Sequence, residues 1–197
     1  MKMTKSGPIA KKLSVSAMML ALAFVLSYFT LWKMPFGGTV TPLSMLPICF
    51  VSIKFGLKWG LGTAFCYSWL QFIQAVGEIS AWGLTPGMLA ATILLDYVLA
   101  FTVLGLSGIL RKKGAGGMIA GTAVACVLRF LVHFASGVIL WANFEKFVAF
   151  GVEWVNHPVL YSACYNGAFM LPETALTVAG IVVLALVPQV KKLIKPE

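Results

Sequence analysis

Long runs of apolar residues, separated by short basic segments, constrain the fold of this chain more than any other feature. A helix that crosses a lipid bilayer needs about 20 largely apolar residues. Six candidate stretches occur, over residues 13–32, 42–55, 57–76, 87–110, 118–141 and 162–188. The second is short and contains Pro42 and Pro47, which predicts a broken, tilted or only partly spanning helix. The sequence therefore predicts an all-α membrane protein, with residues 1–197 forming one integral membrane domain of six transmembrane helices.

The composition excludes the soluble classes of protein. Apolar residues make up 60% of the chain, charged residues only 11%, and the mean hydropathy is +0.93. A typical soluble domain is about 45–50% apolar and about 25% charged. A soluble protein of this length could not bury so much apolar surface, so a soluble enzyme and a disordered chain are excluded. The formal net charge of +9 does not indicate nucleic-acid binding, because the basic residues lie in short clusters between apolar runs.

The positions of these basic clusters predict how the chain is oriented in the membrane. Loops on the cytoplasmic side of membrane proteins are enriched in Lys and Arg. One side of the predicted bundle carries Lys2, Lys5, Lys11, Lys12, Lys54, Lys58, Arg111, Lys112, Lys113, Lys191, Lys192 and Lys195. The opposite side carries only Lys33 and Lys146. Both termini are therefore predicted to be cytoplasmic. The segments 33–41 and 142–161 become outer loops, where we expect a lid over an outward-facing site.

Three charged residues fall inside the predicted membrane helices. They are Asp96 in the fourth, Arg129 in the fifth and Glu173 in the sixth. A charge at mid-membrane costs about 2.5–3.5 kcal/mol on insertion scales, so each is a candidate functional residue. If the three share one cavity, their summed formal charge is negative and the cavity could accept a monocation. The alternative is that Arg129 only neutralises one carboxylate, for example Glu173, as a structural pair.

The fifth predicted helix carries a polar and aromatic stripe. Arg129, His133, Gly137 and Trp141 recur at four-residue intervals and so share one side of a helix. The face of a tryptophan beside a carboxylate such as Asp96 binds organic cations, with about 2 kcal/mol or more when desolvated. Gly137 lacks a side chain where a ligand ring could lie between His133 and Trp141. The stripe therefore favours a binding site over a lipid-facing surface.

The start of the sixth predicted helix offers hydrogen-bonding groups. Tyr161 and Asn166 lie near its outer end, and an asparagine amide can both donate and accept at the edge of a heterocycle. The alternative is a helix cap plus an interfacial tyrosine. The chain contains no P-loop, no H-E-x-x-H and no G-x-S-x-G motif, and no cluster typical of a metal site. We therefore expect a membrane binding protein without a cofactor, a metal ion or an enzymatic activity of its own.

Three segments carry a family resemblance: 95–101 (LDYVLAF), 128–141 (LRFLVHFASGVILW) and 161–167 (YSACYNG). In this order they resemble the thiamine-specific S components (the ThiT family) of energy-coupling factor (ECF) transporters, and the resemblance covers nearly the whole chain. It implies high-affinity binding of thiamine from outside, in a pocket near the outer ends of the fourth to sixth helices, closed by the first loop. It also implies a membrane partner, the T component, two cytoplasmic ATPase subunits that drive import, and a bacterial plasma membrane.

The resemblance also suggests roles for individual residues. Trp141 and His133 would flank the thiazolium ring, and Tyr161 and Asn166 would hydrogen-bond the ligand. Asp96 and Tyr97 stand where the family usually has Glu-Tyr, so the carboxylate is one methylene shorter here.

Two further expectations concern positions where the resemblance is less specific. The aromatic residue on the remaining pocket wall is expected to be Tyr67, Trp69 or Trp82. Ala17 and Ala21 form a small-xxx-small pattern that allows close helix approach, and S components use such alanines to meet the T component.

Alternative functions remain open on the sequence alone. One is an S component for another vitamin or organic cation, which would not share the dependence on Asp96 if its ligand were neutral. Another is an intramembrane enzyme using His133 and Glu173, which would convert its ligand. A third is a solitary secondary transporter, which would take up substrate on an ion gradient without an ATPase.

Overall fold

The computed structural model describes residues 8–141, 148–149, 152–153 and 157–197. Lys2, Lys5 and Lys146, which belong to the charge pattern, lie outside the described residues. So does most of the predicted outer loop 142–161.

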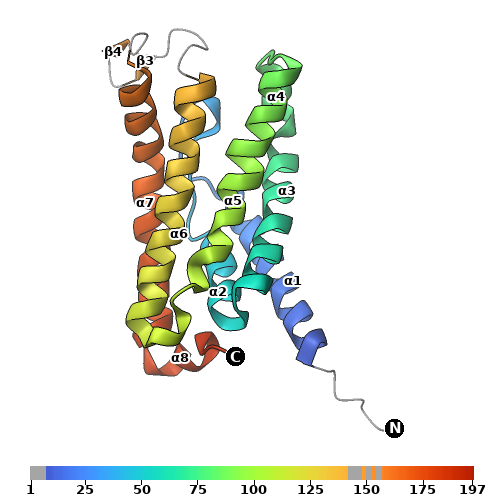
Figure 1. The fold of residues 1–197 in the computed structure, drawn as a ribbon, viewed down its shortest axis with the longest axis vertical. Coiled ribbons are helices and arrows are strands. Elements are labelled where there is room, and N and C mark those ends of the chain that lie inside the picture. Colours follow the sequence, from blue (N-terminus) through green and yellow to red (C-terminus); the bar gives the residue numbers. More distant parts are fainter. Residues whose placement is uncertain (1–7, 142–147, 150–151, 154–156) are drawn as a thin grey trace.

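Each of the six predicted ranges coincides with a helical segment. In chain order these are α1 (Pro8–Ser27), α2 (Leu46–Phe55), α3 (Leu57–Ala81), the run α4–η2–α5–η3 (Pro86–Thr92, Ile93–Leu99, Ala100–Thr102, Val103–Gly108), α6 with η5 (Gly114–Ser136, Gly137–Trp141) and α7 (Pro158–Leu186). The shorter elements are β1 (Trp32–Lys33), η1 (Pro35–Gly37), β2 (Thr39–Val40), η4 (Arg111–Lys113), β3 (Val148–Ala149), β4 (Val152–Glu153) and α8 (Pro188–Ile194). Figure 1 shows the helices running along the long axis, with α8 folded across the lower end.

The helix ends differ from the predicted ranges where local chemistry overrides hydropathy. The first helix ends at Ser27 and not at Trp32, because the apolar residues that follow enter an antiparallel hairpin in which Trp32 pairs with Val40. The second helix begins at Leu46 and not at Pro42, with Pro47 in its first turn, where a missing N–H does no harm. The third is longer than predicted and ends at Ala81.

Three described stretches are long and apolar enough to cross a membrane by length and composition: Ile9–Ser27, Pro86–Trp141 and Pro158–Leu186. The second stretch contains 56 residues and folds into two antiparallel arms. The chain reverses at η4 and at Gly114, whose φ of +72° suits glycine. Figure 1 shows α5 and α6, one from each arm, side by side.

The half of the bundle nearer α8 is packed tightly through glycines. Ser52 of α2 donates to Gly105 O over 2.5 Å and accepts from Gly108 N over 2.9 Å, which locks α2 against η3. A Cβ on Gly105 would lie only 2.6 Å from the backbone of Leu61. A core of fully buried side chains, including Ile48 and Leu104, fills the same half. This half therefore forms a dense base for the more polar half above it.

The two ends of the described chain meet at the α8 end. Lys11 of α1 lies 2.7 Å from a carboxylate oxygen of Glu197, and Glu197 N donates to Lys54 O over 2.8 Å. The start of α1 and the end of the chain thus lie at the same end of the bundle, as the predicted orientation requires. The outer half instead contains a separate apolar cluster in which Met34 and Val40 of the hairpin region pack on Tyr161, Tyr165 and Phe169 of α7.

Candidate functional site

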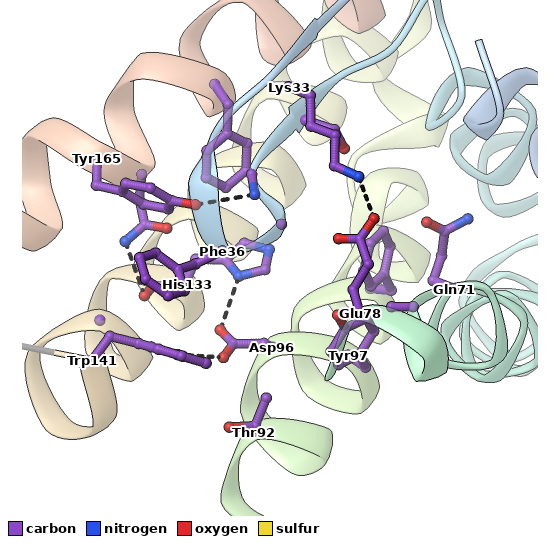
Figure 2. A pocket seen from close by; sticks show the side chains of 18 of the residues that line it. Lys33, Phe36, Gln71, Glu78, Thr92, Asp96, Tyr97, His133, Trp141 and Tyr165 are labelled. Carbon is purple, nitrogen blue, oxygen red and sulfur yellow. Dashed lines mark hydrogen bonds and ion pairs between the residues drawn. The ribbon is translucent and has the colours of Figure 1, made fainter. Parts of the chain in front are cut away.

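A cavity of about 190 Å³ lies between the hairpin β1–β2, α3, η2, α6 and α7. Residues from elements far apart in the sequence line it, so the complete bundle is needed to form it. Figure 2 shows its two sides: Asp96, His133, Trp141 and Tyr165 lie on one, and Lys33, Glu78 and Gln71 on the other.

Asp96 is the polar centre of the first side. Its Oδ2 accepts from Ser136 Oγ over 2.7 Å. The same oxygen accepts from Trp141 Nε1 over 3.0 Å, and Oδ1 lies 3.2 Å from His133 Nδ1 (Figure 2). Both oxygens are therefore engaged, which a carboxylate within a membrane helix requires. The predicted trio of Asp96, His133 and Trp141 is brought together in one hydrogen-bonded group. Trp141 donates its N–H to this carboxylate, so the position of the indole is tied to Asp96.

Two π-helical segments present this group. Asp96 lies in η2 and Trp141 in η5, each of which widens an otherwise α-helical arm. π turns inside α-helices are rare and are frequently found at functional sites. The wider turns carry the Asp96 and Trp141 side chains that meet across the two arms.

Aromatic rings surround the group. Trp82 and Trp141 are perpendicular, with ring centroids 5.3 Å apart. Phe36, at the tip of the hairpin, lies 6.2 Å from Trp82 and 6.1 Å from Trp141. Phe36 holds a φ of +61°, a conformation that costs an L-residue about 1–2 kcal/mol. This strain in the lid is offset by contacts that set the Phe36 ring beside the two indoles.

The hairpin is the lid that the sequence predicts for the first outer loop, and α7 holds it over the cavity. Tyr165 donates its hydroxyl to Pro35 O and accepts from Gly38 N over 3.1 Å (Figure 2 shows one of these bonds). Glu173, about two turns further along α7, accepts from both the backbone N–H and the hydroxyl of Thr41, at the end of β2. The lid is therefore fastened to α7 at its turn and just after β2.

Glu173 also faces the buried Arg129. The two side chains are 3.8 Å apart, and both are less than a tenth exposed. Arg129 lies 4.2 Å over the ring of Phe101 and donates to Met45 Sδ over 2.7 Å. Arg129 lines the cavity floor, whereas Glu173 is not among the lining residues. The two predicted intramembrane charges thus form a pair that ties the floor to the lid.

The mouth of the cavity carries a second ion pair, which the sequence reasoning did not assign to the site. Lys33 of β1 contacts Glu78 of α3, and both side chains are about half exposed (Figure 2). Beside it, Gln74 accepts from Ser27 of α1 over 2.9 Å. Lys33 and Glu78 both lie on the predicted outer side, but no local sequence pattern indicated that they would form an ion pair.

The remaining predicted site residues fall into two groups. Tyr97, Gly137, Tyr161, Asn166 and Trp82 all line the cavity. Tyr67 and Trp69 do not. Tyr67 is fully buried in the core below, edge-on to Phe101 at 5.5 Å, and Trp69 is 42% exposed on the outer face of α3. Among the three aromatic candidates for the remaining wall, the structure places only Trp82 there.

Two of these residues also make structural contacts that the sequence did not predict. A Cβ on Gly137 would collide with Ser162 Oγ and lie 3.0 Å from Asn166 Nδ2, so the missing side chain admits α7 as well as bordering the cavity. Asn166 donates its amide N–H to His133 O over 3.2 Å and to Ser162 O over 3.0 Å. Its amide is thus held between α6 and α7 at the cavity wall.

Phe36, Gln71 and Tyr165 also line the cavity and were not singled out in the sequence. Phe36 and Tyr165 belong to a lid whose closure depends on contacts over more than a hundred residues of chain. Within residues 8–141, 148–149, 152–153 and 157–197, no group of three His, Cys, Asp or Glu side chains could hold a metal ion.

Ala17 and Ala21, the predicted partner contacts, lie on α1. Both are exposed and lie on one face of a helix that packs against α2 and α3 at the edge of the bundle (Figure 1). Neither is among the residues that line the cavity.

Comparison with known proteins gives consistent matches. The family model described as "Thiamine transporter protein" matches residues 13–195. The thiamine transporter ThiT of Bacillus subtilis is 26% identical over 210 residues, covering 99% of each chain. ThiT of Lacticaseibacillus paracasei is 25% identical over 160 residues, covering 74% of this chain and 73% of that protein.

The fold is also that of a solved relative. The structure of ThiT from Listeria monocytogenes matches with a TM-score of 0.70 at 23% sequence identity, covering 94% of this chain and 97% of that chain. This likeness confirms the predicted all-α membrane fold. Because the family model spans nearly the whole sequence, the chain belongs to the thiamine transporter protein family.

Proposed function

We propose that this chain captures thiamine from the outer side of the membrane in the cavity over Asp96, and that it serves as the S component of an ECF importer. The observation that carries this proposal is the charge of the cavity. Lys33 with Glu78 and Arg129 with Glu173 form two ion pairs that cancel in formal charge. Among the described residues at the cavity, Asp96 is then the carboxylate that no Lys or Arg balances. A monocation would neutralise the site.

The walls match the shape of such a ligand. Thiamine joins a flat, permanently charged thiazolium ring to an aminopyrimidine. The face of Trp141, whose N–H is held by Asp96, offers a π surface for the cationic ring, and His133 borders the same space. Tyr161 and Asn166 lie on the α7 wall, where they can serve the polar edge of the pyrimidine. Thiamine transporters among the relatives support the same ligand.

A fluorescence titration tests this function. Wild-type protein, purified alone in detergent, should show saturable quenching of tryptophan emission at nanomolar thiamine, and Trp141→Phe should lose most of the quenching. Trp69→Phe is the matched control, because Trp69 lies outside the cavity lining. Thiamine recovered unchanged after binding would exclude turnover by His133 and Glu173. No response to millimolar thiamine by folded protein would overturn the proposal.

Delivery through partners is the second part of the proposal. We infer that the exposed face of α1 around Ala17 and Ala21 meets a T component, which acts with two cytoplasmic ATPase subunits in the bacterial plasma membrane. Small side chains allow close approach of helices within a bilayer. Ala17→Trp combined with Ala21→Trp should abolish copurification with the T component while thiamine binding in detergent persists. Uptake into vesicles by the chain alone, on an ion gradient, would contradict the proposal and favour a secondary transporter.

A further inference from the structure

The hydroxyl of Ser136 leaves its own helix to reach a carboxylate on another segment. A serine inside a helix commonly donates back to a carbonyl of its own preceding turn. Ser68 does so here, with a bond of 2.7 Å to Phe65 O. Ser136, the last residue of α6, instead donates to Asp96 Oδ2 over 2.7 Å. The bond therefore connects two arms of the bundle at the polar centre of the cavity.

The oxygen that Ser136 contacts is the one that holds Trp141. Asp96 Oδ2 receives Ser136 Oγ at 2.7 Å and Trp141 Nε1 at 3.0 Å. A carboxylate oxygen offers two lone-pair positions, so these two donors fill it. His133 Nδ1 lies 3.2 Å from the other oxygen. Rotation of the carboxylate would break all three contacts, so Ser136 helps to fix the plane of Asp96 and, through it, the position of the indole.

Ser136 does this from behind the cavity wall. It is fully buried and is not among the residues that line the cavity, whereas Asp96, His133 and Trp141 all line it. The backbone after Ser136 is also fixed, because Gly137 packs against Ser162 of α7 too closely for any side chain. The hydroxyl is thus held in place by the fold and does not depend on contact with a ligand.

We propose that Ser136 is a positioning residue for cation recognition: it holds the Asp96 carboxylate so that its charge and the attached Trp141 ring face a cationic heterocycle. A hydrogen bond to an ionised acceptor is about twice as strong as one between neutral groups, so this contact can set the geometry of the carboxylate. The inference rests on the proposed function and deepens it. It assigns to Ser136 part of the preference for a charged ring over a neutral one.

The experiment compares two ligands on Ser136→Ala, a change that removes one oxygen atom. The ligands are thiamine and its neutral isostere in which thiophene replaces the thiazolium, and calorimetry in detergent gives both dissociation constants. Thiamine should bind about tenfold more weakly, as expected for loss of a hydrogen bond to a charged group. The isostere should change by less than about twofold, because it does not depend on the carboxylate charge. Binding of the isostere also shows that the cavity is intact.

Two further variants separate positioning from a general packing role. Ser68→Ala makes the same substitution at another fully buried serine and should leave both constants unchanged. In the Asp96→Asn background, adding Ser136→Ala should weaken thiamine by less than about threefold, because the charged acceptor is already absent. The inference would be overturned if Ser136→Ala weakened the binding of both ligands equally. It would also be overturned if Ser136→Ala weakened thiamine binding by the same factor in the Asp96→Asn background as in the wild type. Wild-type protein that does not bind thiamine would instead overturn the proposed function.

Discussion

The hydroxyl of Tyr165 accepts a 3.1 Å hydrogen bond from the backbone N–H of Gly38, which joins the first third of α7 to the tip of the lid. The same hydroxyl donates to Pro35 O, so a single phenol engages both sides of the turn η1. One polar atom therefore makes both hydrogen bonds that hold the turn of the lid on α7, and its removal leaves the aromatic ring in place.

Tyr165→Phe should increase the rate at which thiamine leaves the cavity. Two hydrogen bonds of the lid are lost, each worth about 0.5–1.5 kcal/mol net. Together they amount to about 1–3 kcal/mol, so we expect dissociation to become about five- to 140-fold faster, with a much smaller change in the association rate. Stopped-flow fluorescence measures both rates. Tyr28→Phe, at a tyrosine that is 60% exposed and does not line the cavity, is the control. An unchanged dissociation rate would show that Tyr165 does not hold the lid.

Asp96→Asn should weaken thiamine binding and spare a neutral ligand. The amide keeps the shape of the side chain but removes the charge that no Lys or Arg balances at the cavity. Hydrogen bonds to a charged group contribute about 1.5–3 kcal/mol, so affinity for thiamine should fall at least about tenfold. Calorimetry provides the measurement. Glu197→Gln, a carboxylate at the α8 end of the bundle, should have no effect. If a neutral vitamin bound tightly to both proteins, an S component of another specificity would be favoured.

Arg129→Gln should destabilise the fold. It would leave the nearly buried Glu173 carboxylate without its cation, and breaking a buried pair by removing one partner costs about 3–5 kcal/mol. The thermal midpoint in detergent should therefore fall clearly. Adding Glu173→Gln should restore part of the loss, because the second change removes the stranded charge. A double variant no better than the single variant would mean that Arg129 acts through Met45 and Phe101 and not through Glu173.

Gly105→Ala should destabilise the half of the bundle nearer α8. Its Cβ would lie 2.6 Å from the Leu61 backbone, which cannot yield as a flexible side chain can. Overpacking of this kind costs about 1–3 kcal/mol. The matched control is Gly62→Ala on α3, where a Cβ would meet nothing within 4 Å. The thermal unfolding midpoint of this variant should stay unchanged or rise. Equal midpoints for the two variants would mean that the contact between α3 and η3 can relax.

The fold class and the family were predictable from the sequence, and both predictions are confirmed. Apolar length marks a membrane helix because unpaired backbone groups cannot be left in lipid, so hydropathy alone carries much of the information. Hydropathy does not mark where such a helix ends. Residues 28–32 are mostly aromatic or aliphatic and prolong the apolar run, yet they lead into a hairpin whose pairing of Trp32 with Val40 competes with the helix.

The cavity was predictable only in part. Asp96, His133 and Trp141 stood out because charged and polar groups are costly in a bilayer, and the structure joins them in one hydrogen-bonded group. The wall aromatic was not resolved, because the sequence does not show which of Tyr67, Trp69 and Trp82 reaches the cavity: Tyr67 and Trp69 lie inside α3, whereas Trp82 follows its end. The partnership of Lys33 with Glu78 depends on how the lid folds onto α3, which no local pattern encodes.

The two π-helical segments bear on how this family can change over time. A π turn closes its hydrogen bond one residue later than an α turn, so it holds one residue more than the helix around it needs. Loss of a residue from η2 would return that arm to α-helix and leave the flanking turns in register. The turn that such a deletion removes is the π turn that presents Asp96. Ligand preference is thus located where a one-residue deletion would disturb the rest of the bundle least.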